Sequence, residues 1–382
     1  MISLSSTQIT AFVADACAEI EQSHNDAWSD ITTGKLRRSQ HEAQFVARLC
    51  AGARDIAVRW RPRIRRINPS LTLSFTSVFT HQSPYVEWPP ATHANRCELA
   101  DLLIAIIDRT NLPGDGRAVL IQAKQSDTGT AHLTTPSEKD QFELLSGRPV
   151  FDVDSTTPAP SGVDLSAMMP DDALQYGLNP PDATPATSSS WANHRWTMAD
   201  TLASLSKTPQ VKVTTSPCLA DWMVEQLQSN RGWKFDLPPT KHDWAYFTKV
   251  PHRDDWSALI NYLLAVTFYK PLNQLSFGSS PPDRGLDEPL CFVNRTPKGK
   301  VMFALFARDR RARLGLRRQL PPARLFQLGE SHWRRVESIP WTALSGDGGA
   351  GGGGADQEGS LRPPPDNGPI SAIVFEIGKR PE

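Results

Sequence analysis

Apolar residues near the N-terminus recur with the period of an α-helix. The first expected helix carries Ile9, Phe12, Val13, Ala16 and Ile20 on one face, with a capping segment at residues 5–7. A second helix is expected over about residues 33–59, with an apolar face that begins at Phe45. Residues 71–79 then alternate apolar and hydroxyl side chains, which predicts a half-buried strand.

Two apolar runs form the strongest pattern of the chain. Residues 97–108 and 117–124 are rich in β-branched residues, and they flank the turn-forming loop at residues 110–116. This arrangement predicts an antiparallel hairpin. A short helix capped by Ser137 is expected to follow at residues 137–145.

The rest of the chain is less regular. Residues 151–190 are rich in Pro, Ser, Thr and Asp and predict an irregular segment with one docked patch at residues 174–178. Beyond it we expect helices at 197–205, 218–228 and 254–267 and strands at 211–214, 291–293 and 301–306. A Gly/Pro-rich loop at 345–368 leads to an apolar strand at 370–377, which must dock on a sheet to bury its side chains.

These elements predict an α/β protein in three parts. Residues 1–150 form an N-terminal part with the hairpin, 151–190 a linker or covering segment, and 191–382 a mixed α/β C-terminal region. The composition, with 39% hydrophobic and 21% charged residues, is that of a soluble globular protein. With no leader sequence and no run long enough to span a membrane, the cytoplasm is the expected location.

The charge distribution gives one candidate surface for nucleic acid. The formal net charge is zero, so the molecule as a whole offers no electrostatic argument. Residues 295–335, however, contain twelve Lys and Arg against two acidic residues, a local net charge of +10. Such a run can neutralise phosphates, and a solvated surface is the alternative. The candidate phosphate contacts are Arg308, Arg310, Arg311, Arg313, Arg317 and Arg318.

Several other kinds of site are not indicated. The five cysteines are scattered and form no CxxC pair, so neither a zinc site nor a disulfide framework is expected. The chain has no GxxxxGK[ST], GxGxxG, HExxH or GxSxG motif, which argues against nucleotide cofactors, zinc proteolysis and serine hydrolysis.

Candidate chemistry gathers at one end of the hairpin. Gln122 and Lys124 are two residues apart, so they point to the same face of a strand, and the hairpin can bring Asp101 beside them. A carboxylate, an amide oxygen and a lysine suit metal-assisted hydrolysis. Taken singly, Asp101 is more simply a strand-end carboxylate, and Lys124 a side chain that extends from an apolar strand to water.

The order of these residues resembles the PD-(D/E)xK nuclease superfamily. The sequence from Leu120 to Lys124 is similar to the Gln-x-Lys variant of Mrr-like restriction nucleases and relatives in bacterial defence. The resemblance covers roughly residues 40–150. It implies a restriction-endonuclease-like mixed sheet flanked by helices, and a nuclease that acts on DNA, as a homodimer or within a defence complex.

The resemblance also implies a metal site and its residues. Mg²⁺ or Mn²⁺ would be held by Asp101 and Gln122, with Lys124 as a catalytic residue. Glu42, a helical glutamate, or Glu98 would supply the carboxylate that Gln122 lacks. Glu98 lies three residues before Asp101, so it reaches the site only if the chain bends between them. For Glu42, a surface position is the simpler alternative.

Two other functions remain open. Gln122 stands where relatives carry glutamate, which favours a catalytically silent nuclease-like module that binds nucleic acid or a partner protein. A structural protein with no role on nucleic acid is the third possibility.

Overall fold

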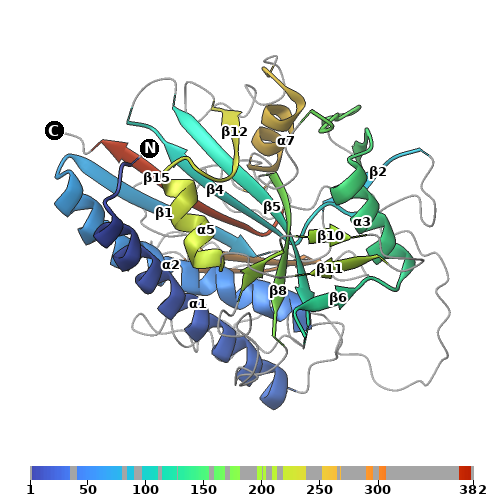
Figure 1. Ribbon diagram of the computed structural model, residues 1–382, viewed down its shortest axis with the longest axis horizontal. Helices are drawn as coiled ribbons and strands as arrows, with labels where there is room; N and C mark the ends of the chain where they lie inside the picture. Colours follow the sequence, from blue (N-terminus) through green and yellow to red (C-terminus); the bar gives the residue numbers. More distant parts are fainter. Residues whose placement is uncertain are drawn as a thin grey trace.

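The fold is that of an α/β protein with a mixed sheet (Figure 1). The computed structural model describes residues 2–34, 41–79, 84–89, 97–110, 114–126, 128–154, 159–167, 173–180, 196–199, 201–203, 209–212, 218–237, 252–264, 267, 290–295, 301–306 and 370–379. Its helices are α1 (Ser6–Gly34), α2 (His41–Ile67), α3 (Pro136–Gly147), α5 (Leu219–Leu227) and α7 (Asp255–Leu264).

The main sheet of the described residues has nine strands. Eight of them follow one another in the order β14 (Val301–Phe306), β13 (Leu290–Arg295), β1 (Leu71–Phe79), β15 (Ala372–Lys379), β4 (Leu102–Asp108), β5 (Asp115–Gln125), β8 (Leu174–Asn179) and β9 (Thr197–Met198). The ninth, β12 (Trp233–Asp236), pairs with the first residues of β5.

The predicted hairpin is confirmed as the antiparallel pair β4–β5. All seven residues of β4 are buried, because the sheet is covered on both faces. Leu102, Ile104 and Ile106 belong to one apolar core, whereas Leu103 and Ala105 belong to the other. This alternation follows from the two-residue period of a strand.

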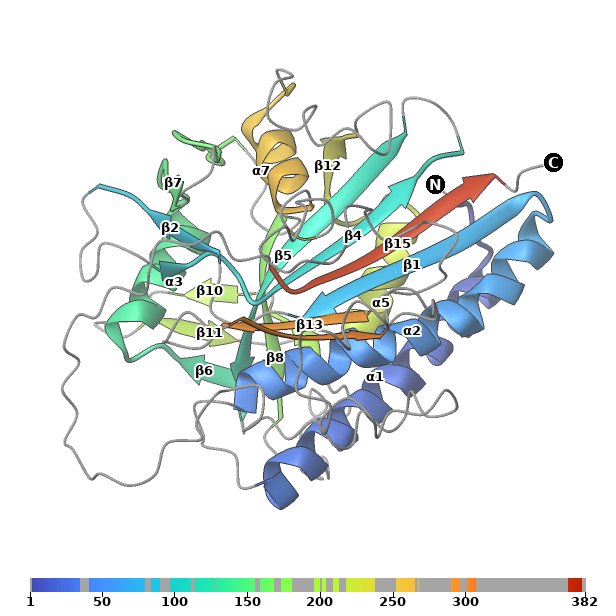
Figure 2. The same cartoon turned by 180° about the vertical axis from the view of Figure 1, so that it is seen from behind.

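The helices divide between the two faces of the sheet (Figures 1 and 2). Helices α1, α2 and α5 pack over one face, and the apolar side chains of α3 and α7 pack over the other. Trp60 of α2 donates its indole N–H to the Phe12 carbonyl of α1 at 3.1 Å, and Arg59 pairs with Glu19 at 2.6 Å. The two N-terminal helices therefore form one layer.

The C-terminal strand lies inside the sheet (Figure 2). β15 pairs antiparallel with β1 on one side and parallel with β4 on the other. The expectation that this strand docks on a sheet is confirmed. The sheet thus contains strands from all three parts of the chain, 1–150, 151–190 and 191–382.

Two small sheets complete the described fold. One contains β3 (Cys97–Glu98), β2 (Tyr85–Glu87) and β7 (Asp152–Asp154), and the other β10 (Thr201–Ala203), β11 (Gln210–Lys212) and β6 (Thr130–His132). The helix expected at 197–205 is wrong, because this segment contributes β9 and β10. The patch at 174–178 is a strand, β8, rather than part of an irregular excursion.

Within the described part of the chain, every helix is too short or too polar to cross a membrane.

Candidate functional site

The site begins where β5 runs past the start of β4. The ladder between them ends with Leu102 opposite Ile121, and the Asp101 N–H donates to the Ile121 carbonyl at 3.0 Å. β5 continues to Gln125 and is paired on its other side with β8 over residues 120–125. Residues 122–125 therefore face a sheet edge that β4 leaves open.

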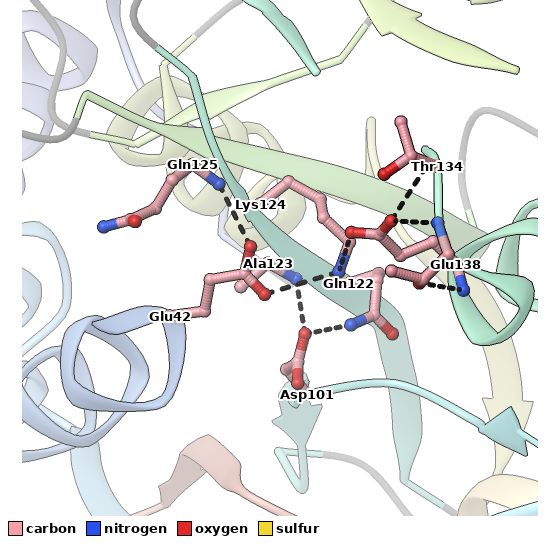
Figure 3. Close-up of polar contacts among 9 residues, drawn as sticks. Glu42, Asp101, Gln122, Ala123, Lys124, Gln125, Thr134 and Glu138 are labelled. Atoms are coloured by element: carbon pink, nitrogen blue, oxygen red, sulfur yellow. Dashed lines mark hydrogen bonds and ion pairs between the residues drawn. The ribbon is translucent and has the colours of Figure 1, made fainter. Parts of the chain in front are cut away.

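Asp101 occupies this open edge. Its Oδ2 accepts a hydrogen bond from the Ala123 N–H at 2.7 Å and another from the Gln122 amide nitrogen (Figure 3). The carboxylate thus takes the place of the strand that would otherwise pair with Ala123. The predicted meeting of Asp101 with Gln122 is present in the structure.

Lys124 lies between two further carboxylates (Figure 3). Its side chain is only 8% exposed, and its Nζ is 3.3 Å from Glu42 Oε2 of α2 and 4.0 Å from Glu138 Oε1 of α3. Glu42 Oε1 also accepts the Gln125 N–H at 3.4 Å. Lys124 is therefore a buried, paired cation and not a lysine that reaches out to water.

Glu138 serves two structural purposes. Its Oε2 accepts the N–H groups of Thr134 and Thr135 at 2.9 and 3.0 Å, while the Thr135 hydroxyl accepts the Glu138 N–H at 3.3 Å. This reciprocal pair is the capping box of α3. The other oxygen, Oε1, faces Lys124, so the start of α3 is tied to the site.

Burial and charge act in opposite directions on the ionisable groups. The pKa of Asp101 is raised to about 7, because burial and the charge of Glu42 outweigh Lys124 and the two hydrogen bonds, which lower it. Burial lowers the pKa of Lys124, but the charges of Glu42, Asp101 and Glu138 outweigh it, and the net shift is upward. Lys124 is therefore charged at neutral pH.

The side-chain oxygen of Gln122 is a candidate ligand atom. Its side chain is buried, and its Oε1 accepts no hydrogen bond from the residues that the structure describes. A buried oxygen without a donor is costly unless a ligand satisfies it. The donor set of Asp101, Gln122 and Glu42 consists of oxygens, which Mg²⁺ and Mn²⁺ prefer. These residues fit a hard divalent cation.

One observation weighs against a strong metal site. Across the described ranges, three or more His, Cys, Asp or Glu side chains never gather in a group that could hold a metal ion. The amide of Gln122 supplies no charge, and Lys124 competes with a cation for Glu42.

The structure brings four of the predicted site residues together: Glu42, Asp101, Gln122 and Lys124. Glu98 lies in β3, where it is paired with Tyr85 of β2 in a small sheet that is separate from the main sheet. It is not among the residues labelled in Figure 3. The six candidate arginines from Arg308 to Arg318 lie outside the described residues.

Sequence reasoning missed Glu138. The Thr135-to-Glu138 spacing is that of a capping box, which is a visible signal in the sequence. That signal predicts a helix start, however, and gives no indication that the second carboxylate oxygen faces Lys124.

Comparison of the chain with protein-family models, with curated proteins and with solved structures found no match. A function must therefore be argued from the site itself.

Proposed function

We propose that this protein is a Mg²⁺- or Mn²⁺-dependent endonuclease that hydrolyses phosphodiester bonds of DNA, in bacterial restriction or defence against phage. The observation that carries the proposal is the meeting of Asp101, Gln122 and the buried Lys124 at the open edge of β5. The order helix α2, strand β1, hairpin β4–β5 and helix α3 agrees with the resemblance.

Charge balance supports a divalent cation. Glu42, Asp101 and Glu138 carry three negative charges when ionised, against the single positive charge of Lys124, which leaves a net charge of −2. Asp101, Gln122 and Glu42 would hold the ion. Turning the Gln122 amide about its last bond exchanges Nε2 and Oε1, which places the oxygen beside Asp101. A bound cation polarises the phosphate and lowers the pKa of an attacking water.

The side chains of this protein supply the rest of the chemistry. The ammonium group of Lys124 stabilises negative charge that develops on phosphate oxygens, and burial strengthens that interaction. Glu42 and Glu138 hold the ammonium group from two helices, so its position is fixed before substrate arrives. Asp101 is fixed by the Ala123 N–H in the same way.

The test is cleavage of supercoiled plasmid, linear duplex and single-stranded DNA, and of RNA, with Mg²⁺ or Mn²⁺ and with EDTA. The wild type should cut DNA only with metal. Lys124→Met keeps the apolar stem but removes the charge, and it should lower the rate on the order of 10²- to 10³-fold. Lys212→Ala, at an exposed position of β11, is the matched lysine control and should cut at the wild-type rate.

Asp101→Asn tests the metal separately. Asparagine retains an oxygen that can accept the Ala123 N–H, so the fold should persist while Mn²⁺ binding, measured by calorimetry, weakens. Cutting that survives Lys124→Met would reject this site. Failure of the wild type to cut any substrate with either metal would reject the enzyme.

The second candidate is a catalytically silent nuclease-like module that binds nucleic acid or a partner protein. It is favoured by the amide at position 122 and by the lack of a three-acid metal cluster among the residues described. This candidate predicts that metal-dependent cutting is absent, and that DNA binding remains if its ligand is nucleic acid.

The basic residues in the segment 295–335 would bind DNA phosphates whether the protein is a nuclease or a silent nucleic-acid-binding module. Replacing the six arginines from Arg308 to Arg318 with alanine should weaken DNA binding and flatten its dependence on salt. The logarithmic slope should fall by about 0.9 for each phosphate that is no longer neutralised. Filter binding at two salt concentrations measures this. A complete lack of salt-dependent binding by the wild type would contradict the nuclease and the nucleic-acid-binding form of the second candidate.

A further inference from the structure

Two cysteines that are far apart in sequence meet at the junction of two helices. Cys17 lies in α1, and Cys218 is the N-cap residue of α5. Their Sγ atoms are 3.9 Å apart, although the residues are separated by 201 positions. A disulfide requires an S–S distance of about 2.0 Å, so the sulfurs need to approach each other by roughly 2 Å.

The surrounding structure holds the pair in place. The Ile2 N–H donates to the Leu227 carbonyl at 3.2 Å, which ties the start of the chain to the end of α5. Cys17 and Cys218 pack in the same apolar core. The two sulfurs therefore belong to a fixed helix–helix contact rather than to mobile loops.

The two cysteines differ in exposure and in hydrogen bonding. Cys218 is buried and its Sγ lies 2.9 Å from Asp221 Oδ2, whereas Cys17 is only half-buried. When Cys17 ionises, the Cys218 S–H can turn from Asp221 to the Cys17 sulfur, and this hydrogen bond lowers the pKa of Cys17, against the opposing effects of burial, Asp221 and Glu21.

The other two cysteines whose surroundings are described are less reactive. Burial raises the pKa of Cys50 to about 12, and it raises the pKa of Cys97 as well. Since the thiolate is the nucleophile in thiol chemistry, Cys17 is the most reactive of these four thiols.

We propose that Cys17 and Cys218 are a redox modification site, at which a small peroxide such as hydrogen peroxide forms a reversible disulfide between α1 and α5. In the first step the Cys17 sulfur attacks a peroxide oxygen, the O–O bond breaks, and hydroxide leaves with a proton as water. Cys17 becomes a sulfenic acid.

In the second step the Cys218 sulfur attacks the Cys17 sulfur. The S–O bond breaks, the S–S bond forms, and the sulfenic oxygen leaves as water with the proton of Cys218. In total two thiols are oxidised and one peroxide is reduced to two waters. Asp221, which accepts the Cys218 S–H, orients the second thiol for this attack.

This disulfide would form whether or not the protein is a nuclease. To test it, the reduced full chain is treated with one equivalent of hydrogen peroxide, free thiols are blocked, and peptides are mapped by mass spectrometry without reductant. We expect one intramolecular link between the peptides that contain Cys17 and Cys218, with loss of two hydrogens and reversal by a phosphine reductant. The oxidised protein should also unfold at a temperature higher by about 5 °C, because the link closes a long loop.

Matched variants identify the partners. Cys50→Ser and Cys97→Ser remove other thiols of the protein interior and should leave the link intact. Cys218→Ser should instead leave Cys17 as sulfenic or sulfinic acid. A link to any other cysteine, oxidation of Cys17 in the wild type without a link, or links between chains alone would overturn the proposal. The peptide map of the wild type decides this even if a variant does not fold.

Discussion

Lys124 is the residue on which the site is organised. Its ammonium group is buried and lies within 4.0 Å of carboxylates from two helices, α2 and α3. A buried lysine without such partners would lose its proton, whereas here the net shift of its pKa is upward. Any change in these carboxylates should therefore change the pKa of Lys124.

Glu138→Gln separates the charge of Glu138 from its role as a cap. The glutamine oxygen can still accept the Thr134 and Thr135 N–H groups, so the free energy of unfolding should change by less than about 1 kcal/mol. The pKa of Lys124 should fall, because one of its carboxylate partners is gone. Activity of the proposed nuclease should fall several-fold with the fold intact.

Glu138→Ala is the comparison for that variant. It removes the capping box as well, and it should cost about 1 kcal/mol more than the glutamine variant. Urea unfolding and cleavage rates measure the two effects. Equal stability of both variants would show that the cap contributes nothing.

The raised pKa of Asp101 predicts a pH dependence of stability in EDTA. The folded-state value of about 7 exceeds the ordinary value of 3.8, so between these pH values the folded protein keeps a proton that the unfolded chain has released. The free energy of unfolding should therefore decrease as pH rises from about 4 to 7, and level off above.

Asp101→Asn removes this titration. Urea unfolding should show that the free energy of unfolding falls more between pH 5 and pH 8 for the wild type than for the variant. The same loss in both proteins would mean that Asp101 titrates alike in the folded and unfolded states.

For the individual residues, the sequence predicted one part of the site and not the other. The two-residue period of a strand placed Gln122 and Lys124 on one face, and the hairpin placed Asp101 beside them. Glu42 could be named only as a candidate, and Glu138 was missed. Their contacts depend on how α2 and α3 dock on the sheet, which no local pattern encodes.

Strand β12 packs closely against β5, because the Phe235 ring lies against the backbone of Gly116. A Cβ atom at Gly116 would overlap the ring of Phe235, its register partner in β12. Glycine is therefore required at this position for the packing of a neighbour, since a side chain would displace a buried aromatic ring.

Gly116→Ala should cost about 1–3 kcal/mol in the free energy of unfolding, because Phe235 must move out of a packed core. Gly378→Ala is the control. There the nearest atom to an added Cβ is Thr72 Oγ1 at an ordinary 3.6 Å, and the change should stay within about 0.5 kcal/mol. Urea unfolding of the two variants compares them directly, and equal losses would contradict the steric explanation.

The elements that sequence reasoning predicted well are those with a strong local period. The hairpin, α5 and the terminal strand fall into this group. The segment at 197–205 was expected to be helical, yet Thr197 and Met198 pair with β8, and the Ala199 N–H donates to the Tyr176 carbonyl at 2.8 Å. A tertiary partner that is distant in sequence overrode the local preference.

For the molecule as a whole, the position of β15 decides which pieces can fold. This strand separates β1 from β4, and Phe375 packs against Trp60 of α2 and Phe75 of β1. The sequence predicted that the strand docks on a sheet. It could not indicate a position between two strands of the N-terminal part, because pairing partners about 270 to 310 residues apart leave no local signal.

A chain that ends at residue 369 should therefore fail to fold, and so should an isolated piece of residues 1–150. Both lack β15, and the shorter piece also lacks β8. Limited proteolysis and circular dichroism should show unfolded or aggregated protein. Removal of residues 380–382 alone is the control and should leave the described sheet intact. A stable, folded 1–150 piece would show that the N-terminal part is an independent domain.

The central position of the terminal strand has a consequence for synthesis on the ribosome. β15 is made after the other described strands, yet it contributes the partner of β4, and the Leu103 N–H, two residues after Asp101, donates to the Ser371 carbonyl at 2.7 Å. In a nascent chain the edges of β1 and β4 that pair with β15 therefore stay unpaired until residues 372–379 leave the exit tunnel. The framework of the site cannot assemble before residues 372–379 have been made, so the proposed nuclease would reach its active form only after β15 has joined the sheet.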